Sequence, residues 1–386
     1  MPNAFVHWLA GHFIVKKTTH VVVVGAGVIG CAVAYEIARR GGRVHVIDRG
    51  EVGQGATQAS AGVLAPYIMA HAGSQFLELG GRSLGLYDEF MARVVEDSGA
   101  AVQYVRSGTL EVACDTKTAR RLQKTACAYR DLGVTADYLD QRAVHEAEPQ
   151  LSATVLSGLV VASHGFVGAA DLTNALRRAA SAYGVIFTPS ALAVKVSRSR
   201  GDGLQVKTPT DTVVCDAVVM AAGSWSGQVE AEGEEPVPVR PVRGQLLHLG
   251  WPKSPLARVI WTDRCYLVPW TDGSVLVGAT VEDVGFDERA TVSGVQQLID
   301  MTCELVPTAR KAWFKGVRVG LRPGTPDDLP AIGPSERLSG LFYATGHFRN
   351  GVLLAPLTAQ IVADYVLDGT RDAALEATAL SRFAAD

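Results

Sequence analysis

The sequence is poor in the residues that build disulfide or metal scaffolds. Six cysteines are spread over 386 residues, and no two of them have the Cys-x-x-Cys spacing of a zinc or redox site. We therefore expect reduced thiols, as in a cytoplasmic protein, and no metal site. The 36 Lys and Arg residues nearly balance the 39 Asp and Glu residues, giving a net charge of −3. This balance argues against a general nucleic-acid-binding surface.

Long hydrophobic runs are also missing. No apolar stretch reaches the length of about 20 residues that crosses a bilayer, so no membrane span is expected. Residues 1–19 contain a moderately apolar piece without the basic start and cleavage site of a signal peptide, and we treat them as an N-terminal extension. The remaining length and the 48% hydrophobic content suit a two-domain soluble enzyme.

What the sequence does contain is glycine at a meaningful spacing. Residues 21–24 are four valines, typical of a buried parallel strand, and the run GAGVIG follows directly over residues 25–30. A helical segment is expected over 31–40 and a second strand over 44–47, with Asp48 at its end. This order of elements predicts a βαβ unit that binds a dinucleotide.

Each part of this unit has a mechanical role. Gly25 permits the tight turn out of the strand, Gly27 lets the backbone approach a pyrophosphate, and Gly30 lets the helix pack closely on the strand. The helix N-terminus offers unpaired N–H groups to the phosphates, and Asp48 can accept hydrogen bonds from a ribose diol. A glycine turn without a ligand has the same six residues, so the prediction rests on the flanking elements. The motif alone does not distinguish FAD from NAD.

A second strand–loop–helix unit lies near the C-terminus, in LFYATGHFRNGVLLAP over residues 341–356. Gly346 and Gly351 bracket a loop whose N–H groups can converge on one acceptor. Pro356 is expected near the first turn of the following helix, where its missing N–H costs little. A helix N-terminus favours the negative charge that a reduced flavin carries at its N1/O2 side. An ordinary connection has the same pattern, but together the two units favour a flavin.

Between these units helical and strand patterns alternate. Helices are expected over 77–97, 116–132, 170–183, 292–306 and 352–367, and strands over 108–113, 205–207, 213–214, 216–222, 244–249, 259–261, 265–269, 274–278, 317–321 and 341–344. Nucleotide-binding elements thus occur at both ends and in the middle of the chain. We predict an α/β fold with a discontinuous Rossmann-like FAD-binding domain and a mixed-sheet substrate domain.

The predicted boundaries follow from this arrangement. The N-terminal extension is 1–19, the FAD-binding domain comprises 20–85, 146–235 and 320–386, and the substrate-binding domain comprises 86–145 and 236–319.

Five motifs together resemble the D-amino-acid-oxidase-like family of FAD-dependent oxidoreductases. They are GAGVIG at 25–30, ASAGVLAP at 59–66, CYLVP at 265–269, GLRPGTPDDLPAIG at 320–333 and ATGHFRNGVLLAP at 344–356. The last two are specific, whereas the first is shared by many families. The resemblance is greatest to the branch that oxidises glycine for thiamine biosynthesis, and it extends from about residue 20 to the C-terminus. It implies a non-covalent FAD and a homo-oligomer, in that branch a tetramer.

The resemblance also implies which residues contact FAD. Beyond Gly25, Gly27, Gly30 and Asp48, these are Val28, Ile29, Arg49, Ala56, Thr57, Ala61, Gly62, Val63, Ala193, Gly223, His347, Phe348, Arg349, Asn350, Gly351, Val352 and Leu353. Of this set, the residues from 347 to 353 are expected along the flavin ring.

Arg322 is the first candidate for binding a substrate carboxylate. It precedes a proline and is therefore in extended backbone, and its guanidinium matches a carboxylate bidentately. A surface salt bridge is the commoner role of an arginine, so this assignment depends on the motif. Tyr266 is the second candidate, although tyrosine is also a common sheet residue. Arg349 could reach the same carboxylate, whereas His347 is not assigned as a base.

The resemblance implies oxidative deamination of glycine or another small amine-bearing acid, such as sarcosine or a small D-amino acid. Hydride would pass to the flavin, with O2 as acceptor and H2O2 as product. A D-amino-acid dehydrogenase with another acceptor is the alternative, and a non-catalytic FAD-binding subunit also stays open. An NAD-dependent enzyme is disfavoured because no second glycine-rich βαβ motif occurs. Departures from the family pattern leave the preferred amino acid open, at Val63, Arg264, Trp270 and Val281.

Overall fold

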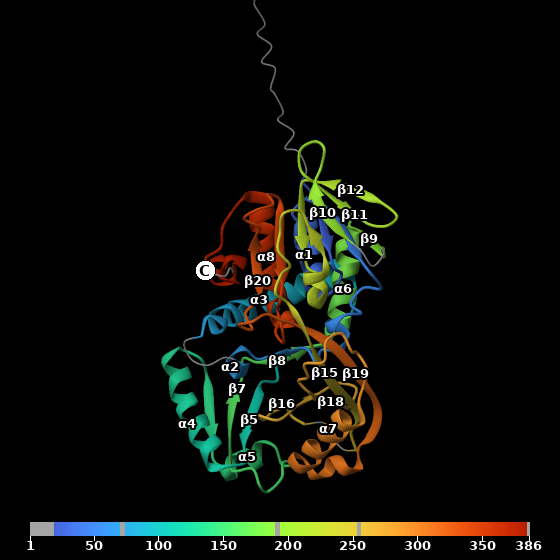
Figure 1. The fold of residues 1–386 in the computed structure, drawn as a ribbon. Helices are drawn as coiled ribbons and strands as arrows, with labels where there is room; N and C mark the ends of the chain where they lie inside the picture. Colours follow the sequence, from blue (N-terminus) through green and yellow to red (C-terminus); the bar gives the residue numbers. More distant parts are fainter. Residues whose placement is uncertain (1–18, 70–73, 190–193, 253–255, 384–386) are drawn as a thin grey trace, which may run out of the picture.

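The computed structural model describes residues 19–69, 74–189, 194–252 and 256–383. In Figure 1, helices α1 (Val28–Arg39), α6 (Ala169–Ala182) and α8 (Gly351–Asp368) lie in the upper half of the molecule. The lower half contains α4 (Thr116–Asp131), α7 (Val292–Leu305) and the long strands. The two glycine motifs belong to the upper half, so the fold separates them from most of the β-rich segment.

A six-stranded sheet with the order β20-β21-β13-β1-β2-β9 forms the centre of the upper half. Its strands are β1 (His20–Val24), β2 (Arg43–Asp48), β9 (Ile186–Pro189), β13 (Ala217–Met220), β20 (Ala331–Pro334) and β21 (Leu341–Thr345). All neighbours pair in parallel except β20, which runs antiparallel to β21 at the edge. The carboxyl ends of the parallel strands therefore meet at one edge, where ligands bind in such sheets.

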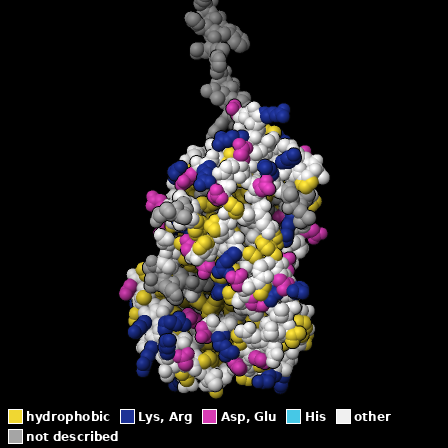
Figure 2. All heavy atoms as spheres, viewed as in Figure 1, with side chains coloured by type: hydrophobic (Ala, Val, Ile, Leu, Met, Phe, Trp, Pro, Cys, Tyr) yellow, Lys and Arg dark blue, Asp and Glu magenta, His cyan; other side chains and the backbone are white. Residues whose placement is uncertain are grey.

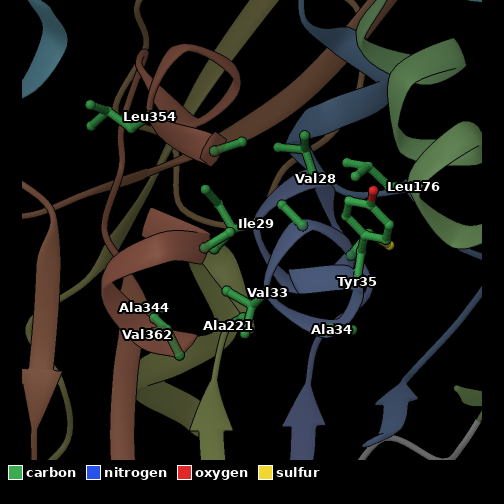
Figure 3. Packing of buried hydrophobic residues seen from close by; sticks show 14 of the residues in the cluster. Val28, Ile29, Val33, Ala34, Tyr35, Leu176, Ala221, Ala344, Leu354 and Val362 are labelled. Atoms are coloured by element: carbon green, nitrogen blue, oxygen red, sulfur yellow. The ribbon is translucent and has the colours of Figure 1, made fainter. Parts of the chain in front are cut away.

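Both faces of this sheet are covered. Helices α1, α3 (Gln75–Ser98), α6 and α8 form one hydrophobic core with it. Figure 3 shows Val28 and Tyr35 of α1 on the side of Leu176 in α6, and Ile29 and Val33 on the side of α8. The opposite face packs against a small sheet of β12 (Thr212–Cys215), β11 (Leu204–Lys207), β10 (Lys195–Arg198) and β14 (Glu230–Ala231).

The lower half is built on an eight-stranded sheet with the order β19-β15-β18-β17-β16-β5-β7-β6. The strands are β5 (Thr109–Ala113), β6 (Ala136–Leu139), β7 (Ser157–Val161), β15 (Arg240–Gly250), β16 (Val259–Trp261), β17 (Tyr266–Pro269), β18 (Ser274–Gly278) and β19 (Trp313–Gly324). Side chains alternate between its faces. Val275 and Val277 pack with α7, whereas Leu276 packs on the other face with Ala61 and Phe166.

Short elements complete the fold. They are β3 (Val63–Leu64), β8 (Gly165–Val167) and β4 (Tyr104–Val105), which form a three-stranded sheet, and the helices α2 (Pro66–Met69), α5 (Gln141–Ala147) and α9 (Ala374–Thr378). Figure 2 shows Lys and Arg side chains gathered at the lower left, where Figure 1 places α4. This local concentration of positive charge is not visible in the net charge of the chain.

The expected α/β fold class is confirmed, but several element bounds differ. The helix expected to begin at residue 31 begins at Val28, so that Gly30 lies inside α1. The strand expected over 317–321 is part of the twelve-residue β19, which pairs with the eleven-residue β15. Strand β7 lies within the segment 146–235 but pairs with β5 and β6 in the lower sheet. The domain boundaries themselves stay a prediction.

Helix α8 corrects two expectations. Among the described residues, α8 has the length and the apolar composition of a membrane-crossing helix, with a mean hydropathy of 1.3. No apolar run of this length was expected from the sequence. Because 61% of it is buried inside the molecule, its composition is that of a core helix. Pro356 is the sixth residue of α8 and therefore lies inside the helix, beyond the first turn where it was expected.

Candidate active site

A cavity of about 840 Å³ connects the carboxyl ends of the parallel strands with the eight-stranded sheet. The predicted residues that line it are Gly25, Gly27, Val28, Ile29, Asp48, Arg49, Ala56, Thr57, Ala61, Gly62, Val63, Gly223, Tyr266, Arg322, His347, Phe348, Arg349, Gly351 and Val352. Gly30, Asn350 and Leu353 are not among the lining residues, and Ala193 lies outside the described residues. The structure thus brings both glycine motifs and the three substrate candidates to one cavity.

The GAGVIG turn is shaped by close backbone contacts. Gly25 has a φ of 111°, and a Cβ there would lie 2.3 Å from the carbonyl oxygen of Ala221. A Cβ at Gly30 would lie 1.9 Å from the carbonyl oxygen of Gly25. At the N-cap of α1, Gly27 supplies no side-chain cap, and the Val28 N–H donates to the Thr57 hydroxyl at 3.2 Å. The start of α1 therefore faces the cavity with the positive end of its dipole.

Asp48 ties this turn to the end of β2. Its carboxylate accepts hydrogen bonds from the N–H of Ala26 at 2.6 Å and from the N–H of Gly50 at 2.9 Å. The two carboxylate oxygens keep further lone pairs, so a ribose diol could bind there as well. The backbone contacts were not expected from the sequence, which suggested the ribose contact alone.

Arg49 is held by an aromatic contact that sequence reasoning missed. Its guanidinium carbon lies 3.5 Å from the ring centroid of Trp225, within the range of a cation–π interaction. Phe286 packs against the same indole with ring centroids 5.7 Å apart. Trp225 and Arg49 both line the cavity. No periodicity links residues so far apart in the chain, so only the fold reveals this wall of the site.

The loop between β21 and α8 is bent sharply toward β19. Gly346 and Phe348 have φ values of 72° and 47°, and the left-handed conformation is rare for a residue such as Phe. The Phe348 N–H donates to the Pro323 carbonyl at 2.9 Å, which fixes the loop next to Arg322. His347 is buried, and its Nε2 lies 3.0 Å from Thr358 Oγ1. Burial lowers the pKa of His347 to about 3, so its ring is neutral at ordinary pH.

The N-terminus of α8 resembles that of α1 in having no capping side chain. Asn350 occupies the N-cap position without a side-chain cap, and its buried Oδ1 has no hydrogen-bond partner among the described residues. Such buried polar atoms are uncommon, but Asn350 does not line the cavity, so this atom does not mark the ligand site. Two helix N-termini without capping side chains, a glycine cradle and one cavity of about 840 Å³ fit a dinucleotide that carries a flavin at one end.

Arg322 of β19 lies across the neighbouring strand. Its guanidinium covers Gly244 of β15 so closely that a Cβ there would lie 2.3 Å from Nη2. Nη1 donates to the Thr280 carbonyl at 3.0 Å. Among the described residues no carboxylate lies within ion-pair distance of Arg322, so the surface salt bridge that we considered does not describe it. Burial lowers the pKa of the guanidinium, while the nearby phenol of Tyr266 raises it.

Tyr266 of β17 completes this end of the cavity. Its ring lies over Gly278 of β18, the residue directly opposite it in the sheet, and stacks on Trp261 with ring centroids 4.9 Å apart. Burial raises the pKa of the phenol, and the positive charges of Arg322 and Arg349 lower it. Tyr266 and Arg322 interact through their side chains. Gly244 and Gly278 make room for these two side chains, and sequence reasoning missed both glycines as well as Trp261.

Comparisons with known proteins agree with this geometry. Residues 20–365 match the family DAO, described as FAD dependent oxidoreductase. Glycine oxidase from Geobacillus kaustophilus is 33% identical over 348 residues, which cover 90% of this chain and 92% of that protein. The crystal structure of glycine oxidase from the same organism has a TM-score of 0.89 at 31% identity, covering 95% of this chain and 100% of the other.

A further relative is the bifunctional protein ThiO/ThiG of Trichormus variabilis. It is 32% identical over 373 residues, which cover 95% of this chain but 55% of that longer protein. The family match, the relatives and the cavity between the two glycine motifs agree in one conclusion. The chain belongs to the family of FAD-dependent oxidoreductases, it is an enzyme of that type, and FAD is its cofactor.

Proposed function

We propose that this enzyme oxidises glycine or another small amine-bearing acid, such as sarcosine or a small D-amino acid, with O2 as electron acceptor. The glycine oxidase relatives support oxidation of an amino acid. The observation that carries the proposal is the guanidinium of Arg322, which has no carboxylate partner among the described residues and lines the same cavity as both glycine motifs. A substrate carboxylate would supply that partner.

The proposed cofactor placement follows the two helix N-termini. Residues of the GAGVIG turn, Val28 and Ile29 among them, would hold the pyrophosphate, with Asp48 and Arg49 at the ribose. The residues from Ala56 to Val63 would line the path to the flavin ring. The N–H groups at the start of α8 would face the N1/O2 side of that ring, where negative charge develops on reduction.

In the proposed mechanism, the bound flavin supplies the acceptor for a hydride from the substrate Cα. Arg322 would hold the carboxylate with its two parallel N–H donors, and the Tyr266 hydroxyl would bind the same group or close the pocket above it. This fixes the substrate in one orientation. No side-chain base is required when the amine enters in its neutral form. The imine product hydrolyses to ammonia and a keto acid, and for glycine this acid is glyoxylate. O2 is reduced to H2O2.

This mechanism predicts that kcat/KM rises with pH. The neutral amine is the reactive form, so kcat/KM should increase about tenfold per pH unit below the amine pKa. The titration of His347 or Tyr266 does not offset this increase. The pKa of His347 is lowered to about 3, below this pH range, and burial raises the pKa of Tyr266. The check is kcat/KM for glycine from about pH 6 to about pH 8, with His347→Gln as the control that keeps the same slope. A flat profile would show that the amine need not lose a proton.

The oxidase assignment is tested by stoichiometry. Under air, each glycine consumed should remove one O2 and yield one glyoxylate, one ammonia and one H2O2. Oxygen uptake, peroxide and keto acid are measured in the same reaction. Turnover with an artificial electron acceptor but without peroxide would instead support the D-amino-acid dehydrogenase.

On the resemblance, we propose that the enzyme works in thiamine biosynthesis and as a homo-oligomer, which in the related branch is a tetramer. We propose that it works in the cytoplasm because its six cysteines show the scattered spacing of reduced thiols. We also keep the domain division predicted above, with residues 20–85, 146–235 and 320–386 binding FAD.

A further inference from the structure

The first turn of α8 lacks one of its own backbone hydrogen bonds. Pro356 has no N–H, so the carbonyl of Val352, four residues earlier, loses its usual donor. Val352 is buried at 6% exposure, so water is a poor substitute. A buried carbonyl without a partner is destabilising, and the protein must supply a donor from elsewhere.

Helix α3 lies next to α8 (Figure 1), and two of its hydroxyl groups contact the start of α8. The Tyr87 hydroxyl donates to the Val352 carbonyl at 2.6 Å and so replaces the missing donor. Ser83 Oγ donates to the Leu353 carbonyl at 2.7 Å and accepts from the Leu357 N–H at 3.4 Å, so it is inserted into the next bond of the helix. Ser83 and Tyr87 are four residues apart on one face of α3, and both are fully buried. The start of α8 is therefore held by α3 in addition to its own backbone, whose first bond runs from the Leu354 N–H to the Asn350 carbonyl at 2.8 Å.

The turn held in this way is the one that faces the cavity. Gly351 and Val352 line the cavity, and the N-cap has no capping side chain. The carbonyl of Val352 and the N–H of Leu353 belong to the same peptide unit. A donor on that carbonyl polarises the peptide and strengthens its N–H as a donor. Burial raises the pKa of Tyr87 well above its ordinary value, so its hydroxyl stays a donor at any working pH.

We infer that Tyr87 and Ser83 are positioning residues, which act through the first turn of α8 to set the affinity and the reduction potential of the flavin. This inference rests on the proposed placement of the flavin against the N-terminus of α8. The alternative is that the two hydroxyls only satisfy a buried helix and contribute to stability alone. The two explanations differ in what happens to the cofactor.

The test compares Tyr87→Phe with Tyr35→Phe in the purified holoenzyme. Tyr35 is an equally buried tyrosine of the same core, but its hydroxyl donates to Asp97 at 2.6 Å, away from α8. We expect Tyr87→Phe to raise the FAD dissociation constant about fivefold to tenfold and to shift the flavin midpoint potential to more negative values. Tyr35→Phe should change neither quantity, although both variants are expected to melt at a lower temperature.

A second variant tests the route through the Val352 carbonyl. Adding Pro356→Ala to Tyr87→Phe restores a backbone N–H at position 356, which can donate to that carbonyl. The potential and the dissociation constant should return toward those of the unchanged enzyme. If Tyr87→Phe does not fold, Ser83→Ala tests the neighbouring contact at the Leu353 carbonyl, with the expectation of weaker FAD binding and a more negative midpoint potential.

Equal melting losses with an unchanged potential and an unchanged dissociation constant would overturn the inference. Neither measurement uses an amino acid, since the potential comes from a reductive dye titration and the affinity from reconstitution with FAD. Failure of the inference is therefore distinct from failure of the proposed substrate, which would show as a wild-type flavin that no amino acid reduces.

Discussion

Replacing Arg322 with Ala is expected to raise KM for the amino acid about 100-fold or more while FAD stays bound. A bidentate pair consists of two charge-assisted hydrogen bonds, each contributing about 1.5–3 kcal/mol, so losing both corresponds to at least two orders of magnitude. The Arg322 guanidinium packs on Gly244 of β15 and belongs neither to a helix N-terminus nor to the glycine turn. Its removal therefore leaves the proposed contacts to FAD in place. Steady-state kinetics and the flavin absorbance of the purified variant check both parts.

Two further variants sharpen this result. Arg322→Lys keeps the charge but not the planar fork, so its KM should fall between those of the wild type and Arg322→Ala. Arg318 lies four residues earlier on the same strand, near the Trp270 ring, and does not line the cavity. Arg318→Ala should therefore leave KM within about twofold. An unchanged KM in Arg322→Ala would remove this residue from the carboxylate role.

A methyl group at Gly30 is expected to abolish FAD binding. Its Cβ would lie 1.9 Å from the Gly25 carbonyl oxygen, which is backbone and cannot rotate away. Either α1 or the turn after β1 must move, and overpacking of this kind costs about 1–3 kcal/mol in addition to the lost site. Gly30→Ala should purify without colour, bind FAD at least about 100-fold more weakly, and unfold at a lower temperature.

The matched control is Gly85→Ala in the exposed part of α3. A Cβ at Gly85 would have no atom within 4 Å, and alanine favours the helix over glycine by about 0.5–1 kcal/mol. This variant should keep its full flavin content and be at least as stable as the wild type. Full flavin content in Gly30→Ala would show that close packing of α1 on β1 is not needed for the site.

The sequence was most informative where a local pattern has one physical meaning. Four valines followed by GAGVIG predicted the strand, the turn and the helix. In the structure the strand begins one residue earlier, at His20, and α1 extends from Val28 to Arg39 instead of from residue 31 to residue 40, so that Gly30 packs within the helix. The pairing of the two glycine units was also predicted, and the structure agrees, because the carboxyl ends of β1 and β21 meet at the same edge of one parallel sheet. These segments were predictable because their chemistry is local.

Contacts between distant segments could not be predicted. The contact of Trp225 with Arg49 joins two segments that lie outside the strands and far apart in the chain. The space that Gly244 and Gly278 leave for Arg322 and Tyr266 depends on strand register rather than on periodicity. Strands β9 and β20 escaped detection because short strands at the edges of a sheet have weak patterns.

Pro356 is the clearest case of this limit. Proline normally marks a helix boundary, and the prediction placed it near the first turn on that ground. The helix extends past it because the Tyr87 hydroxyl donates to the Val352 carbonyl, which the proline leaves without its usual N–H, while Ser83 bridges the next bond of the helix. The compensation comes from residues more than 260 positions earlier in the chain, which no local pattern reveals.

The most direct measurement is an anaerobic titration of the purified holoenzyme with glycine, followed through the flavin absorbance. We expect glycine to bleach the wild-type flavin and the same concentration to leave the flavin of Arg322→Ala oxidised, although dithionite bleaches both. A wild-type flavin that stays oxidised with glycine, sarcosine and small D-amino acids, while dithionite still reduces it, would show that the enzyme does not oxidise small amino acids.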